Sequence, residues 1–280
     1  MSRLIVLCEN SAGPAYGILG EHGFSVLVER DGRSLLFDTG QGRTIIHNAG
    51  CLKKDLSRID KIVLSHGHYD HTGGLKQVLQ KAGPVDVCAH PAVFSQRFAA
   101  IQKEGVATYR SAGMLAARSE LEDLGARFVF NTVFTEIERG VYLTGEVPRT
   151  NCFETDDTRL VVIRAGRYVQ DSVVDDQSLV LESAQGLVVI LGCAHSGVIN
   201  ILNHIAAHFP GQSVHTLIGG THIGFLGDDQ VEKTIEALKE FSLQKIGVSH
   251  CTGLAPGMRL MQAFGERFFF ATAGSILEIA

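Results

Sequence analysis

Residues 65–71, SHGHYDH, carry the densest set of metal-ligand side chains in the sequence, directly after the apolar run KIVL at 61–64. A short continuous apolar run is typical of a strand that is covered on both faces. Gly67 allows the sharp bend that lets two imidazoles converge. Imidazole and carboxylate are the usual ligands of zinc and related cations. A histidine-rich surface loop that binds nothing is the alternative. The predicted metal ligands in this stretch are His66, His68, Asp70 and His71.

Three later histidines follow a common pattern, in which an apolar strand ends in a loop of small residues that carries one histidine. His195 comes after the apolar run GLVVIL, His222 after HTLI, and His250 after KIGV. A site for two metal ions needs more ligands than one loop supplies, and these should come from other strand ends. We therefore expect the three histidines to join the SHGHYDH loop in one pocket.

The order of predicted elements indicates the architecture. Early hairpins are followed by alternating strands and helices, and the same order then returns, which suggests two sheets with helices outside them. We predict an α/β (α+β) protein with a single domain, 1–280, in a four-layer αββα sandwich. The pattern is looser at about 95–160, and this segment is predicted to be a lid or an insertion.

Composition excludes several classes of protein. The net charge is −5 and the pI about 6.2, which does not suggest a nucleic-acid binder. The six cysteines are scattered, with no CxxC pair, and so do not form a disulfide framework. No stretch reaches the length of a membrane span, and the N-terminal apolar run is too short for a signal peptide. We expect a cytoplasmic protein with a small-molecule partner, and a homo-oligomer stays open.

The hexapeptide HGHYDH (66–71) matches the HxHxDH signature of the metallo-β-lactamase superfamily, which the chain resembles over essentially its whole length. The segments TGEVPR (144–149), GCAHSGVINI (192–201) and GGTHIGF (219–225) resemble one branch of it. That branch contains the archaeal dihydropterin–ribofuranosylaminobenzene phosphate synthases and related metal-dependent hydrolases. The resemblance implies the metallo-β-lactamase fold and two divalent ions, with zinc as the default and manganese or iron as alternatives.

The resemblance also implies how the ligands divide between the ions. One ion would be held by His66, His68 and His195, and the other by Asp70, His71 and His250. Most of the superfamily has a further aspartate that bridges the ions, but this chain has His222 at that strand end. We therefore expect no bridging carboxylate there, and His222 is either a substitute ligand or a donor to the substrate. With Asp70 as the only anionic ligand, the two ions should bind with unequal affinity.

Several other residues are predicted to lie around the metals. Asp38, in LLFDTG, should accept a hydrogen bond from a metal-bound imidazole, with a simple role at the hairpin end as the alternative. Cys193 and Cys251 are interpreted as buried packing residues. By resemblance to the branch, four residues should face the substrate, with turn formation or plain exposure as the alternative. These predicted substrate-binding residues are Asn10, Glu21, His22 and Arg149.

Three functions are compatible with these residues. The first is a dinuclear metal-dependent hydrolase, in which a metal-bound hydroxide attacks a small anionic, phosphoester-like substrate and Asp70 and His222 act as catalytic residues. The second is a transferase like the branch's synthases, which joins a dihydropterin methyl diphosphate to a ribofuranosylaminobenzene phosphate and releases diphosphate. The third is a non-catalytic metal-binding sensor.

Overall fold

The computed structural model describes residues 2–280, which form two seven-stranded sheets and one four-stranded sheet. In sheet order, the first consists of β18 (Ile276–Ile279), β1 (Ser2–Cys8), β2 (Ser25–Arg30), β3 (Arg33–Phe37), β4 (Lys61–Val63), β5 (Val85–Ala89) and β8 (Ala126–Phe130). The second consists of β17 (Phe268–Phe270), β16 (Lys245–Ser249), β15 (Val214–Gly220), β14 (Gly186–Leu191), β13 (Leu179–Ser183), β10 (Val141–Leu143) and β9 (Thr135–Glu138).

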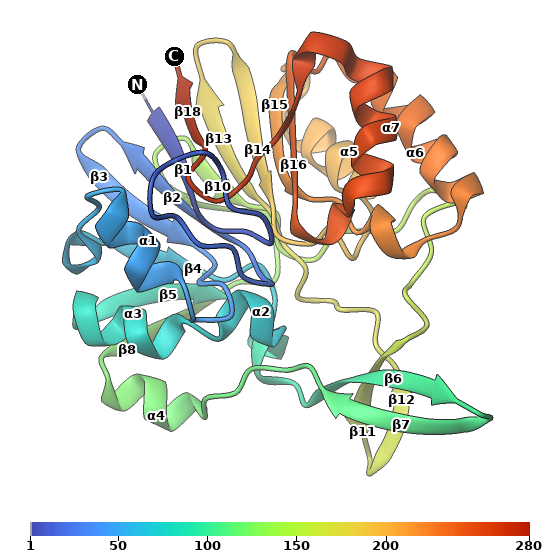
Figure 1. The fold of residues 1–280 in the computed structure, drawn as a ribbon, viewed down its shortest axis with the longest axis horizontal. Helices are drawn as coiled ribbons and strands as arrows, with labels where there is room; N and C mark the ends of the chain where they lie inside the picture. Colours follow the sequence, from blue (N-terminus) through green and yellow to red (C-terminus); the bar gives the residue numbers. More distant parts are fainter. Residues whose placement is uncertain (1) are drawn as a thin grey trace.

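Helices cover the outer face of each large sheet (Figure 1). Beside the first sheet lie α1 (Ile45–Cys51), α3 (Leu75–Ala82) and α4 (Arg118–Asp123). Beside the second lie α5 (Val198–His208), α6 (Asp228–Lys239) and α7 (Leu254–Phe264). This arrangement confirms the predicted four-layer αββα sandwich. The short α2 (Tyr69–Thr72) stands at the edge of the first sheet, within the SHGHYDH loop.

Three hydrophobic cores fill the three spaces between these layers, as the period-two alternation of strand side chains requires. In β1, Leu4 and Val6 belong to the core between the two sheets, whereas Ile5 and Leu7 belong to the core under the first sheet's helices. The third core packs the second sheet against α5, α6 and α7. Both large sheets are thus buried on both faces, which explains why their strands read as continuous apolar runs.

The four-stranded sheet lies apart from the sandwich (Figure 1). Its strands, in order, are β12 (Arg167–Gln170), β11 (Leu160–Arg164), β6 (Arg97–Lys103) and β7 (Val106–Ser111). β6 and β7 lie within the segment of looser pattern at about 95–160, whereas β11 begins at its end. Both strand pairs, β6–β7 and β11–β12, are antiparallel hairpins. The role of that segment as a lid or insertion stays a prediction. Among residues 2–280, no helix is both long and apolar enough to cross a membrane.

The parallel strands place the loops that carry the predicted metal ligands at one edge of the sandwich. In the first sheet β3, β4, β5 and β8 are parallel, and in the second β14, β15 and β16 are parallel. Carboxyl ends of parallel strands share one edge of a sheet, where binding sites of such folds are found. The loops that follow β3, β4, β14, β15 and β16 therefore meet.

Candidate metal centre

The first group of predicted ligands converges as expected. The ligand atoms of His66, His68 and His195 all lie within 4.8 Å of one another, although His195 comes from the other sheet. The Nε2 atoms of His66 and His195 are 3.3 Å apart. The Nε2 atom of His68 is buried and has no hydrogen-bond partner. A buried polar atom without a partner is costly, and a cation would satisfy it. These three side chains fit a metal ion.

The second group gathers around the Asp70 carboxylate. Its Oδ2 atom lies 3.2 Å from Nε2 of His250 and 3.0 Å from Nε2 of His22. The Nε2 atom of His71 lies 3.3 Å from that of His250. The ligand atoms of His22, Asp70 and His250 lie within 4.8 Å of one another. The structure thus brings the predicted ligands Asp70 and His250 together with His22. The predicted ligand His71 meets this group through His250, and its ligand atom also lies within 4.8 Å of that of His66.

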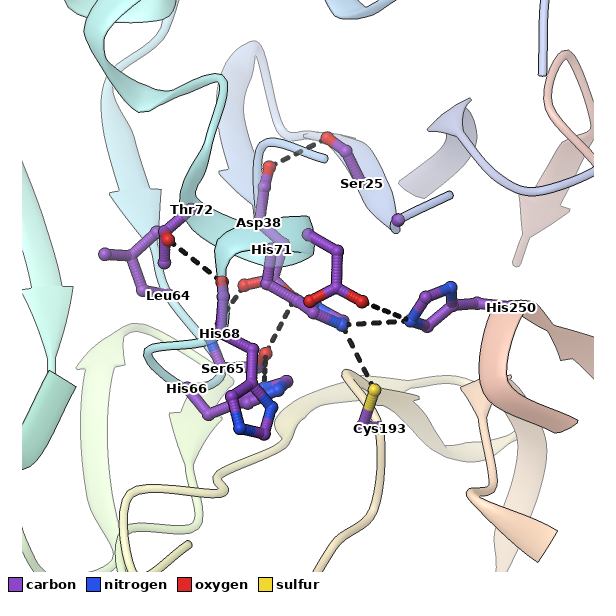
Figure 2. A network of polar contacts seen from close by, with 12 residues as sticks. Ser25, Asp38, Leu64, Ser65, His66, His68, His71, Thr72, Cys193 and His250 are labelled. Atoms are coloured by element: carbon purple, nitrogen blue, oxygen red, sulfur yellow. Dashed lines mark hydrogen bonds and ion pairs between the residues drawn. The ribbon is translucent and has the colours of Figure 1, made fainter. Parts of the chain in front are cut away.

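Asp38 connects both groups through hydrogen bonds, as Figure 2 shows. Its Oδ2 atom accepts hydrogen bonds from Nδ1 of His71 and from Oγ of Ser65, both at 2.6 Å. Because the Ser65 hydroxyl donates to Asp38, it accepts from Nδ1 of His66, at 2.9 Å. Each of these imidazoles is thereby fixed with its Nε2 atom facing the cluster. Asp38 orients one histidine of each group, in the way that carboxylates orient metal-bound imidazoles.

Burial keeps the imidazoles of the first ligand group neutral. Burial lowers the pKa of His66 and of His195 well below their ordinary value, and burial together with Arg97 lowers the pKa of His68 to about 3. These imidazoles are neutral, which is the form that binds metal. Burial raises the pKa of the Asp70 carboxyl, but hydrogen bonds from His22 and His250 outweigh it and hold that pKa well below its ordinary range.

Backbone strain is concentrated in the loops that carry these side chains. Asp38, Ala194, His222 and His250 have φ values of 57°, 57°, 55° and 51°. A left-handed conformation costs a residue other than glycine about 1–3 kcal/mol and is found disproportionately at functional sites. Four such residues at one edge of the sandwich indicate that the loops are shaped for the site rather than for stability.

His222 lies beside the first group but is held by a partner that the sequence did not suggest. Its Nε2 atom is 3.1 Å from Oδ2 of Asp157, and its ring centroid is 4.3 Å from that of His195. Burial lowers the pKa of His222, but the hydrogen bonds with Asp157 and Cys251 outweigh it and raise the pKa to about 9. As predicted, the end of β15 offers no carboxylate, and Asp228 and Asp229 begin α6.

Among the predicted substrate-binding residues, the structure brings only His22 to the pocket over the cluster. The Asn10 Oδ1 atom lies 2.8 Å from Nδ1 of His250, so Asn10 orients a predicted ligand instead. The Glu21 carboxylate accepts hydrogen bonds from the Gly42 and Arg43 amides, which is the turn-forming role given above as the alternative.

Arg149 is also turned away from the pocket. Its guanidinium donates to the carbonyl oxygens of His195 and Ser172, at 3.0 and 2.7 Å, and pairs with Asp156. Arg149 thus contacts the backbone of His195, a predicted metal ligand, and does not line the pocket in which it was predicted to bind substrate. The error has a simple cause, because the sequence does not reveal which carbonyl groups lie within reach of a long side chain.

A pocket of about 270 Å³ opens above the cluster. Its base includes His68, Asp70, His195, His222 and His250, and its walls include Tyr69, Arg110, Arg159 and Phe225. The walls are preorganised by contacts between cationic and aromatic side chains. Arg110 donates to the Tyr69 hydroxyl at 2.9 Å, and the Arg159 guanidinium lies 4.4 Å from the centre of the Phe225 ring.

A buried ion-pair network connects the SHGHYDH loop to the start of β6 in the four-stranded sheet. The Arg97 guanidinium, at the start of β6, donates to both Asp175 oxygens at 2.8 and 2.5 Å and to Asp171 at 2.8 Å. Asp175 in turn accepts a hydrogen bond from the Gly67 amide, at 2.8 Å, between two predicted ligands. Sequence analysis missed this network because its members are 74 to 108 residues apart.

The chain is similar to known proteins of one superfamily. Residues 19–138 match the metallo-β-lactamase superfamily. The crystal structure of Tm1679, a metal-dependent hydrolase of the β-lactamase superfamily, is similar to the chain with a TM-score of 0.84 and 31% identity, covering 100% of each. Zn²⁺-bound PqqB from Methylobacterium extorquens has a TM-score of 0.55 and 14% identity, covering 99% of each, and shares the fold.

A relative of named activity matches along nearly the whole chain. It is the 7,8-dihydropterin-6-methyl-4-(β-D-ribofuranosyl)-aminobenzene-5'-phosphate synthase of Methanocaldococcus jannaschii, which is 29% identical over 287 residues. The match covers 99% of this chain and 96% of the synthase. Together with the sandwich and the converging histidines, these similarities show that the chain belongs to the metallo-β-lactamase superfamily.

Proposed function

We propose that the protein is a dinuclear metal-dependent hydrolase of a small anionic substrate. The observation that carries the proposal is the convergence of two ligand groups, from loops of both sheets, at the base of one pocket. His66, His68 and His195 would hold one divalent ion, and Asp70, His71 and His250 would hold the other. Zinc suits this set of imidazoles and a carboxylate, and manganese and iron are the alternatives.

Divalent ions, when bound, polarise the substrate and lower the pKa of water. The side chains of the chain do the remaining work. The Asp70 carboxylate, held by His22 and His250, can accept a hydrogen bond from the attacking water and orient it. The imidazole of His222, fixed by Asp157, can donate to the substrate or its leaving group. In this role His222 is a donor rather than a substitute ligand.

The charge of the pocket supports an anionic substrate. Among the groups of potential ligands in residues 2–280, Asp70 supplies the only carboxylate, so bound divalent ions would keep most of their positive charge. Arg110 and Arg159 add two cationic side chains to the walls, and Asp157, which pairs with Arg159, adds one carboxylate. A small phosphoester, with its charge near the ions and its apolar part against Tyr69 or Phe225, matches this distribution.

The test compares two histidine variants with an activated phosphodiester as substrate. His68→Ala removes the imidazole whose Nε2 has no protein partner, and it should abolish metal-dependent turnover while the circular dichroism spectrum stays native. His208→Ala, in an exposed imidazole of α5, is the matched control and should keep its activity. Turnover that survives both chelation and the His68→Ala substitution would remove the proposal.

A second candidate function is favoured by the full-length similarity to the archaeal synthase. In that reaction the same ions would bind a diphosphate leaving group, and an aryl amine would replace water as the nucleophile. Incubation with the pterin diphosphate, with and without the ribofuranosylaminobenzene phosphate, separates the two. Diphosphate release that requires the amine would identify a synthase, and release without it would identify a hydrolase.

A further inference from the structure

We propose that the thiolate of Cys193 is a metal ligand that lies between the two ions and takes the place of the missing bridging carboxylate. The inference depends on the proposed dinuclear centre and specifies how that centre is completed. It revises the interpretation of Cys193 as a packing residue, which the sequence had favoured.

The position of the sulfur carries the proposal. The Cys193 Sγ atom lies 3.1 Å from Nε2 of His71, and Figure 2 shows it directed into the cluster. It also lies within 4.8 Å of ligand atoms of His66 and His195 from the first group and of His250 from the second. No packing role requires a sulfur to be surrounded by imidazole nitrogens of both predicted sites.

The local backbone explains why Cys193 points inward. β14 ends at Leu191, and Ala194 adopts a φ of 57°, so the chain bends sharply between Cys193 and His195. The side chains of Cys193 and His195 both point into the histidine cluster, where their ligand atoms lie within 4.8 Å of each other. The end of β15 lies close to the bend that carries Cys193. A Cβ atom added to Gly220 would lie 2.5 Å from the Gly192 carbonyl oxygen.

Charge gives the sulfur a function. Asp70 is the only carboxylate within these ligand groups of residues 2–280. A thiol that coordinates a metal ion loses its proton and contributes one negative charge. Cys193 would therefore restore the charge balance that His222, at the end of β15, cannot supply. The expected difference in affinity between the two ions should be smaller as a result.

The neighbouring Cys251 is less suited to this role. Its sulfur receives the backbone amide of His222, at 3.3 Å, and lies 3.5 Å from the Cys193 carbonyl oxygen. Among the ligand groups found in residues 2–280, Cys251 belongs to one, with Cys193 and His250, whereas Cys193 belongs to three. Cys251 is therefore the matched control, because it is a buried thiol of the same cluster.

A thiolate also predicts metal preference. Soft sulfur ligands favour zinc or cobalt, whereas a purely imidazole and carboxylate site accepts manganese readily. We expect the wild-type protein to bind zinc in preference to manganese, and Cys193→Ser to lose at least about tenfold of its zinc affinity, the scale seen when a supporting partner of a ligand is removed.

X-ray absorption at the zinc edge of the wild-type, zinc-loaded protein tests the proposal without any substitution. A sulfur shell at about 2.3 Å is expected beside the nitrogen and oxygen shell at about 2.0–2.2 Å. Zinc bound in a spectrum with no sulfur shell would overturn the role of Cys193 and leave the dinuclear hydrolase intact. A wild-type protein that binds no zinc, manganese or iron would instead overturn the proposed function itself, and this inference with it.

The two cysteine variants then identify the sulfur. Cys193→Ser should lose the sulfur shell, and Cys251→Ala should keep it. The reverse result would assign the ligand to Cys251 and contradict the proposal. The cobalt-loaded forms give a second readout, because a thiolate–cobalt charge-transfer band should be present in wild type and Cys251→Ala and absent from Cys193→Ser.

Discussion

Replacement of Arg97 by methionine should destabilise the protein strongly and loosen the metal centre. The guanidinium is 2% exposed and makes three hydrogen bonds, of 2.5 to 2.8 Å, to Asp171 and Asp175. The Arg97→Met variant leaves both carboxylates buried without a cation. Breaking a buried ion pair from one side costs about 3–5 kcal/mol, mostly because the remaining charge is uncompensated. We expect a loss in that range.

Arg97→Met should also weaken metal binding, because Asp175 holds the backbone of the loop that carries His66 and His68. Asp175 accepts from the Gly67 amide, between His66 and His68, and it is itself fixed by Arg97. Once Asp175 is free to move, the two imidazoles lose part of their alignment. A loss of about 10–100-fold in zinc affinity is expected, as for other partners that orient metal ligands.

Urea denaturation of the metal-free variants, followed by circular dichroism, measures the first effect, and competition with a chelator measures the second. The control is Lys233→Ala, which breaks an exposed ion pair with Asp229 on α6 and should change the free energy of unfolding by at most about 0.5 kcal/mol. A loss below about 1 kcal/mol for Arg97→Met, or unchanged zinc affinity, would refute the reasoning.

Three further changes test other parts of the site. Asp38→Asn should weaken zinc binding about 10–100-fold, measured by chelator competition, because Asp38 orients imidazoles of both groups. Gly67→Ala should abolish tight binding in the same assay, since its Cβ would lie 2.1 Å from the Val93 carbonyl oxygen. Glu154→Ala should cost about 1–3 kcal/mol in urea denaturation, because Glu154 accepts from two amides at the start of α5. Burial raises the pKa of Glu154 above its ordinary value. Its stabilising contribution is therefore complete below about pH 4.3, the ordinary value, and is lost as the pH rises through the folded value. The stability of wild type relative to Glu154→Gln should accordingly fall as the pH rises above about 4.3.

Sequence reasoning succeeded where the signal is local. The strands and the histidines at strand ends are encoded by neighbouring residues, and the sandwich follows from their order. Asp38 was found because the stretch LLFDTG resembles the one that carries the corresponding aspartate in the superfamily. The orientation of Asp38 toward His71 then agrees with the prediction.

Partners that are distant in the sequence were not predictable from it. Arg97 and Asp175 are 78 residues apart, and Asp157 and His222 are 65 apart, with no motif linking either pair. Cys193 carries a local motif, but a buried cysteine is ordinarily a small apolar residue, and only the position of its sulfur distinguishes a ligand. For Glu21 the sequence left a substrate contact and turn formation open, because backbone amides that are close in space cannot be identified from a sequence.

The central claim is that two divalent ions occupy the histidine cluster. Anomalous diffraction at the zinc edge, on crystals of the zinc-loaded protein, tests it most directly. The account predicts two peaks, one within coordination distance of His66, His68 and His195 and one within coordination distance of Asp70, His71 and His250. A single peak, or peaks away from these side chains, would contradict it.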